Sequence, residues 1–160
     1  MKKNSGKIWK FGNNIDTDQM LPSQYLMLEN IEEMKKYAFE SIDKDFSRKV
    51  VKGDLIVAGK NFGCGSSREQ APSVLKSLGI DLIIAHSFAG IFFRNAINIG
   101  LPVLICDNLY KYTKTGEVLK IDIKNGIILH ITGEYACTKM PKEIIKIINY
   151  GGLINYTNSK

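Results

Sequence analysis

The chain has 160 residues, of which 44% are hydrophobic and 24% charged, a composition typical of a globular protein with a buried core. No apolar run approaches the length of a membrane span, and the N-terminus lacks the apolar segment of a signal peptide. The net charge of +6 comes from dispersed lysines rather than from a basic run or a zinc-finger spacing, which suits an anionic small molecule better than nucleic acid. We therefore expect one soluble, cytoplasmic domain over residues 1–160 that binds neither membrane nor nucleic acid.

The three cysteines, Cys64, Cys106 and Cys137, lie far apart in the sequence. Their spacing argues against a CxxC metal module and against a disulfide scaffold, so we expect reduced thiols and no metal bound by this chain. Both histidines, His86 and His130, are isolated in the sequence and are expected to be structural.

The N-terminal part begins with residues 6–11, which alternate apolar and polar side chains and predict a strand ending in a turn at residues 12–14. The acidic segment Asp16-Thr17-Asp18-Gln19 follows. Its carboxylates could orient an arginine or a substrate hydroxyl, or they could form a turn or cap a helix. The residues alone favour the turn.

A short apolar run, Leu26-Met27-Leu28, comes next within residues 22–29 and is too short for a core helix. It either contacts a ligand or packs in the core. Residues 31–39 have the spacing of an amphipathic helix, and the charged residues 41–52 predict a surface loop.

The most informative stretch is Gly59-Lys-Asn-Phe-Gly-Cys-Gly-Ser-Ser-Arg-Glu-Gln-Ala-Pro72, between a strand at residues 54–58 and a helix at residues 73–78. Glycines 63 and 65 allow backbone N–H groups to approach an anion, and Ser66, Ser67 and Arg68 concentrate two hydroxyls and a guanidinium there. The serines also fit the spacing of helix caps. Cys64 either has a thiol activated by Arg68 or is a small buried side chain, and we favour the second.

Common glycine-loop signatures fail on this stretch at identifiable positions. A Walker loop requires a lysine where Ser66 stands, and a dinucleotide fingerprint starting at Gly63 requires a small residue at Arg68. The hydrolase elbow requires a glycine at Arg68 as well.

The rest of the chain predicts an α/β fold with added β structure. A strand at residues 81–85, a buried helix at 88–99 and a strand at 103–106 continue the alternation of a parallel sheet with right-handed crossovers. The glycine loop then lies at a strand's carboxyl end, where such sheets bind ligands. Arg94, in the second helix, is either an ion-pair partner or an anion contact. We expect a β-hairpin formed by strands at residues 116–123 and 127–131. A closing helix is expected at residues 141–150.

Phe-Gly-Cys-Gly-Ser-Ser-Arg-Glu69, together with Asn14-Ile-Asp-Thr-Asp-Gln19, resembles the aconitase superfamily, in particular the small subunits of 3-isopropylmalate dehydratases and their homoaconitase-like relatives. Ser87-Phe-Ala-Gly-Ile-Phe-Phe-Arg-Asn-Ala-Ile-Asn-Ile-Gly-Leu-Pro102 is similar to a second signature of that family. The resemblance covers nearly the whole chain. Gly90 stands where the family often has arginine, and Gln70 where it has histidine.

The resemblance implies a single swivelling β/β/α domain with a central, mostly parallel sheet. It implies that Ser66 is the catalytic base, acting as an alkoxide, and that Ser67, Arg68 and Asp18 bind substrate, supported by Gly63, Gly65 and Thr17. The run of Leu26, Met27 and Leu28 would contact the variable end of the substrate, where an arginine would instead select a distal carboxylate.

The implied reaction removes water from a 2-alkylmalate and returns it with hydroxyl and hydrogen exchanged, as in leucine biosynthesis. Loss of hydroxide needs a Lewis acid, and the resemblance places a [4Fe-4S] cluster on a separate large subunit. This chain would be inactive alone, and self-association of the isolated chain is left open. The alternatives are a related hydro-lyase, homoaconitase or 2,3-dimethylmalate dehydratase, and a non-catalytic anion- or nucleic-acid-binding module.

Overall fold

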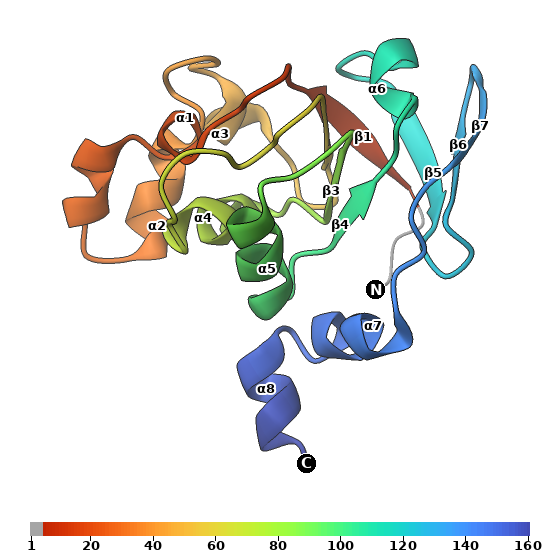
Figure 1. Ribbon diagram of the computed structural model, residues 1–160. Coiled ribbons are helices and arrows are strands. Elements are labelled where there is room, and N and C mark those ends of the chain that lie inside the picture. The colour runs from red at the N-terminus through yellow and green to blue at the C-terminus, as the bar shows by residue number, and fades with distance from the viewer. Residues whose placement is uncertain (1–4) are drawn as a thin grey trace.

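The computed structural model describes residues 5–160 and contains a seven-stranded sheet in the order β4-β3-β2-β1-β5-β6-β7 (Figure 1). The strands are β1 Ser5–Lys10, β2 Leu55–Ala58, β3 Leu82–Ala85, β4 Val103–Ile105, β5 Val118–Asp122, β6 Ile127–His130 and β7 Gly133–Ala136. Strands β1 to β4 pair in parallel, whereas β5, β6 and β7 extend the sheet from β1 in antiparallel fashion. The predicted α/β class with a mostly parallel central sheet is confirmed.

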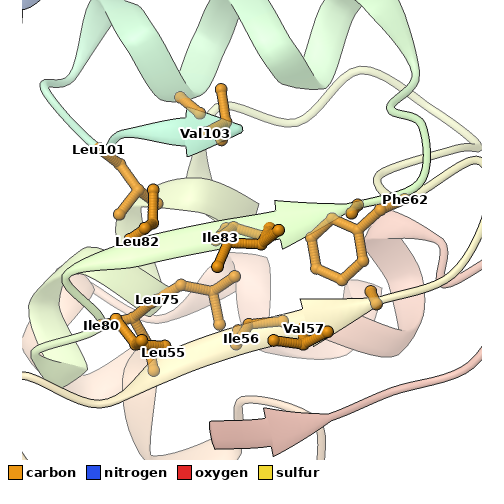
Figure 2. Close-up of a cluster of buried hydrophobic side chains, with 14 of the residues drawn as sticks. Leu55, Ile56, Val57, Phe62, Leu75, Ile80, Leu82, Ile83, Leu101 and Val103 are labelled. Carbon is orange, nitrogen blue, oxygen red and sulfur yellow. The ribbon is translucent and has the colours of Figure 1, made fainter. Parts of the chain in front are cut away.

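The two halves of the sheet differ in burial, as their sequences predict. Every residue of β2 and β3 is buried, because these β-branched runs are covered on both faces. Strand β5 alternates exposed and buried residues, since one of its faces meets water. Figure 2 shows the resulting core, in which side chains of β2, β3 and β4 pack with Leu75 and Phe62.

The helices are mostly short. They are α1 Thr17–Met20, α2 Ile31–Met34, α3 Phe46–Lys49, α4 Gln70–Leu78, α5 Gly90–Asn98, α6 Leu109–Tyr112, α7 Lys142–Asn149 and α8 Leu153–Asn158, with the 3-10 turns η1 Ser23–Met27 and η2 Lys35–Tyr37. Helix α5 lies between α4 and the C-terminal pair α7 and α8 (Figure 1). No helix within residues 5–160 is long and apolar enough to cross a membrane.

The structure corrects two predicted elements near the N-terminus. The helix expected over residues 31–39 is divided into α2 and η2, and Phe39 adopts a left-handed conformation with φ 58°. The reason is tertiary: the buried ring of Phe39 stacks on Phe11 at 4.2 Å and meets Phe46 edge-on at 4.9 Å. The loop expected at residues 41–52 accordingly contains α3, which supplies Phe46 to the core.

Three further predictions were incomplete or wrong. The hairpin of β5 and β6 exists, but β7 adds a third antiparallel strand. Helices α6 and α8 were not predicted, because their short apolar runs have too few residues to show a helical period. Helix α5 is only half-buried, since Ile91 and Arg94 are exposed to solvent.

Candidate active site

The glycine loop that follows β2 is held in place by the segment around Thr17. The N–H of Gly63 donates to the carbonyl of Ile15 at 2.8 Å, and the N–H of Thr17 donates to the carbonyl of Cys64 at 3.0 Å. The Thr17 side chain, only 3% exposed, donates from Oγ1 to the carbonyl of Ser66 at 2.8 Å. Thr17 therefore contacts the loop directly through both its backbone and its side chain.

Gly63 and Gly65 both have a left-handed backbone, with φ +83° and φ +88°. A Cβ atom at Gly63 would lie 2.1 Å from Cγ of Phe92, whereas one at Gly65 would first meet Cβ of Asp16 at 3.4 Å. The loop thus requires glycine at position 63 both for its backbone conformation and for its close approach to α5.

Arg68 is anchored on one side and open on the other. Its side chain is 17% exposed, and Nη1 donates to Oδ1 of Asp18 and to the carbonyl of Leu21, each at 3.1 Å. Its Nε and Nη2 donate to no group within residues 5–160, and neither atom is sealed from solvent. The guanidinium therefore keeps an edge with two donors, the arrangement that binds a carboxylate bidentately.

The acidic segment at the start of α1 contains two carboxylates with different partners. Asp16 caps α1: its side chain accepts from the N–H of Gln19, and the Gln19 side chain accepts from the N–H of Asp16. Asp18 pairs with Arg68 and also accepts from the N–H of Ser23 at 3.1 Å. The helix-capping and arginine-orienting alternatives are thus both present, on different residues.

Ser66 and Ser67 are exposed, and neither hydroxyl is hydrogen-bonded to another group in the part of the chain that the structure describes. The capping interpretation of these serines is wrong, because α4 begins at Gln70 after Glu69, with no side-chain cap. Pro72 fits there, since the first turn of a helix needs no N–H acceptor. No backbone N–H from residue 65 to residue 69 has an acceptor within residues 5–160. These groups therefore lack an internal acceptor, which is the condition that an anion-binding loop requires.

The loop faces the first turns of α5 across a cavity of about 140 Å³. Its walls include Ser66, Ser67 and Arg68 on one side and Gly90 and Asn95 on the other. Pockets that enclose a whole small ligand usually have roughly 300–1,000 Å³. This cavity therefore suits one polar end of a ligand, with the remainder held by another surface.

Sequence reasoning missed the contribution of α5 to this cavity. Ile91 and Asn95 are four residues apart and line the same wall, which is the spacing of one helix face. The available signal was Gly90 and Asn95, a small and a polar residue within a helix that also contains Arg94 and Asn98. Arg94 is exposed, does not line the cavity and has no charged or hydrogen-bonded partner within residues 5–160.

The run of Leu26, Met27 and Leu28 lies in and just after η1. Met27 is 89% exposed, which excludes the core alternative for that side chain, while Leu26 and Leu28 are half-buried against the core. None of the three lines the cavity. The hydrogen bond from Ser23 to Asp18 nevertheless connects the start of η1 to the carboxylate that holds Arg68.

The cysteine thiols have raised pKa values. Burial, reinforced by the nearby carboxylate of Asp16, raises the pKa of Cys64, so the favoured structural interpretation fits better than an activated thiol. Burial also raises the pKa of Cys106, and burial with the neighbouring Cys106 raises that of Cys137 to about 11.

The residues of this chain do not fit an iron–sulfur cluster. Cys64 lies in the glycine loop, whereas Cys106 and Cys137 lie together near β4 and β7, and a thiol with a raised pKa is a poor ligand. Within residues 5–160, no three His, Cys, Asp or Glu side chains are grouped so that they could hold a metal ion. The two histidines are hydrogen-bonded elsewhere, His86 to the carbonyl of Asp107 and His130 to Glu117.

A comparison with models of known protein families identifies the family of this chain. The family model of the aconitase C-terminal domain matches residues 3–108. The chain belongs to this family. The matched residues include both the glycine loop and the α5 segment that faces it.

Curated relatives extend the similarity to nearly full length. The chain is 46% identical over 158 residues to the 3-isopropylmalate dehydratase small subunit of Hydrogenobaculum sp. (strain Y04AAS1), covering 97% of this chain and 96% of the relative. It is 46% identical over 157 residues to the isopropylmalate/citramalate isomerase small subunit of Methanocaldococcus jannaschii, covering 97% and 94%. The predicted resemblance to dehydratase small subunits is confirmed.

A solved structure agrees with the fold. The crystal structure of 3-isopropylmalate dehydratase from Methanocaldococcus jannaschii superposes with a TM-score of 0.91 at 40% identity, covering 98% of this chain and 93% of that one. The aconitase-family architecture predicted from the motifs is therefore also the architecture observed.

Proposed function

We propose that the chain is the small subunit of a heteromeric hydro-lyase that interconverts 2-isopropylmalate and 3-isopropylmalate by dehydration and rehydration, a step of leucine biosynthesis. One observation carries the proposal: Ser66, Ser67 and Arg68 line a single cavity, while Nη1 of Arg68 is held by Asp18 and its Nε and Nη2 remain unpaired within residues 5–160. The names of the full-length relatives support the same reaction.

Each polar group of the cavity has a distinct part in this chemistry. The Nε and Nη2 donors of Arg68 bind a substrate carboxylate, and the Ser67 hydroxyl donates to the same group. The Ser66 hydroxyl, which has no partner within residues 5–160, takes the proton from the carbon beside that carboxylate. The unpaired N–H groups of the loop and the Arg68 charge favour the alkoxide form that this proton transfer needs.

The small cavity supports a shared active site. The cavity of about 140 Å³ can hold only part of an alkylmalate. A large subunit therefore completes the pocket and contributes the [4Fe-4S] cluster. We further propose that residues 1–160 act as one swivelling domain in the cytoplasm.

The decisive experiment reconstitutes the purified chain with a cluster-bearing large subunit and measures isopropylmalate isomerisation. Ser66→Ala is expected to lower kcat by roughly 10²–10⁴-fold, the usual contribution of general-base catalysis, because it removes the oxygen that accepts the substrate proton. Neither subunit alone should turn over substrate.

Ser159→Ala is the matched control, since this serine lies after α8 and its hydroxyl donates to the Tyr156 carbonyl, far along the chain from the glycine loop. It should leave kcat within about twofold, the range of an exposed neutral substitution. An unchanged rate for Ser66→Ala, or turnover by the isolated chain, would refute the proposal.

Met27→Arg tests the alkyl specificity proposed for the run of residues 26–28. An exposed guanidinium at this position is expected to improve kcat/KM for a malate carrying a terminal carboxylate relative to isopropylmalate by about tenfold, the value of one exposed charge-assisted hydrogen bond. Met27→Gln controls for side-chain length without charge. If the ratio of the two kcat/KM values stays constant, residues 26–28 do not contact the variable end of the substrate.

A further inference from the structure

Asn95 lies on α5 and lines the cavity that also contains Ser66, Ser67 and Arg68. Helix packing fixes its position: Phe92 and Ala96, its neighbours along the helix, are buried in the core, while Asn95 itself is only half-buried. Asn95 therefore belongs to a rigid element and lines the cavity on the wall opposite the glycine loop.

The Asn95 side-chain amide forms no hydrogen bond within the part of the chain that the structure describes. Asn13, Asn30 and Asn125 accept or donate hydrogen bonds in turns and caps, whereas the Asn95 side chain has no hydrogen-bond partner within residues 5–160. None of its polar atoms is sealed off either, because no buried side-chain nitrogen or oxygen of the described chain lacks a partner. The amide is thus unpaired and not sealed from solvent, in a residue that lines the cavity.

The donors already assigned to the substrate leave a place for this amide. An ionised carboxylate offers about four acceptor positions on its two oxygens. The open edge of Arg68 fills two of them and the Ser67 hydroxyl a third, all from the loop side of the cavity. A neutral N–H donor on the opposite wall would fill the fourth without adding charge.

We infer that Asn95 is a substrate-binding residue whose side-chain amide donates to the carboxylate held by Arg68. This inference rests on the proposed function. By donating to the carboxylate from α5, Asn95 fixes the orientation of that carboxylate relative to Arg68. The adjacent C–H bond of the substrate is thereby directed toward Ser66. Arg68 and Asn95 together would recognise substrates in which the carboxylate is attached to the carbon that loses its hydrogen.

The test uses the enzyme reconstituted with its large subunit and measures kcat and KM for isopropylmalate, together with the inhibition constant of malonate, a dicarboxylate that does not react. Asn95→Ala is expected to raise both KM and the malonate inhibition constant by about 10–100-fold, the value of a hydrogen bond to a charged group. Asn95→Asp should lower kcat/KM further, because it replaces the donor with a second negative charge.

Asn98→Asp is the matched control. Asn98 is one turn away on the same helix, is exposed and does not line this cavity. The Asn98→Asp substitution introduces the same negative charge into α5 as Asn95→Asp. It is expected to leave KM and the malonate inhibition constant within about twofold of the parent values. Thermal denaturation of the isolated small subunits verifies folding; Asn95→Ser is used where Asn95→Ala lowers the Tm.

The outcomes separate this inference from the proposed function. If a folded Asn95→Ala or Asn95→Ser variant has unchanged KM and malonate inhibition while Arg68→Ala loses both, the inference about Asn95 is wrong and the proposed function stands. If Arg68→Ala and Ser66→Ala are equally silent, the proposed function fails and the inference fails with it. A merely structural Asn95 would change the Tm without a selective effect on malonate.

Discussion

Replacing Arg68 with lysine should lower kcat/KM of the reconstituted enzyme by roughly 10–100-fold, mostly through KM, although the positive charge is kept. The reason is geometric. Arg68 uses Nη1 for Asp18 and Leu21 and still presents Nε and Nη2 to a carboxylate. An ammonium group cannot hold the protein on one side and present a planar two-donor edge on the other. Steady-state kinetics with isopropylmalate provides the measurement.

Arg94→Lys is the matched control for this prediction, because Arg94 is exposed on α5 and does not line the cavity. Its kinetics should stay within about twofold of the parent chain. Asp18→Asn separates anchoring from binding: it keeps an acceptor for Ser23 but weakens the pairing, so a KM increase smaller than that of Arg68→Lys is expected. Equal kinetics for Arg68→Lys and the parent would show that the open edge of Arg68 binds no carboxylate.

Gly63→Ala is expected to destabilise the isolated chain by about 2–5 kcal/mol and to displace the serine loop. The left-handed backbone costs about 1–2 kcal/mol for a residue with a Cβ. Overpacking typically adds about 1–3 kcal/mol. The new methyl would lie 2.1 Å from Cγ of Phe92, a buried ring that meets Phe62 edge-on at 5.3 Å and cannot move freely. Urea denaturation followed by circular dichroism gives the change in the free energy of unfolding.

Gly65→Ala and Gly116→Ala separate the two causes. Both positions have a left-handed backbone, φ +88° and φ +95°, but a Cβ would first meet an atom at 3.4 Å at Gly65 and none within 4 Å at Gly116. Each should cost only the backbone component, about 1–2 kcal/mol. A loss of stability at Gly63 no greater than at Gly116 would contradict the predicted contact with Phe92.

The amino-acid sequence by itself determined the fold class and the loop side of the candidate site. The apolar runs of β2 and β3, separated by a helical period, are strong local signals, since hydrophobic periodicity depends only on near neighbours in sequence. Family motifs then indicated Ser66, Ser67 and Arg68 as a set, and orientation of an arginine was one of the roles left open for the acidic segment that contains Asp18. These residues come from continuous signatures that a single stretch can display.

Only the tertiary structure decided what lies opposite the loop and which way individual side chains face. Asn95 enters the cavity because α5 packs across from the glycine loop, an arrangement set by Phe62 and Phe92 rather than by any local pattern. The break of the predicted helix at Phe39 and the third antiparallel strand β7 likewise depend on contacts between distant segments. Packing free energy is shared among residues far apart in sequence, and it overrides the weak local preferences of short elements.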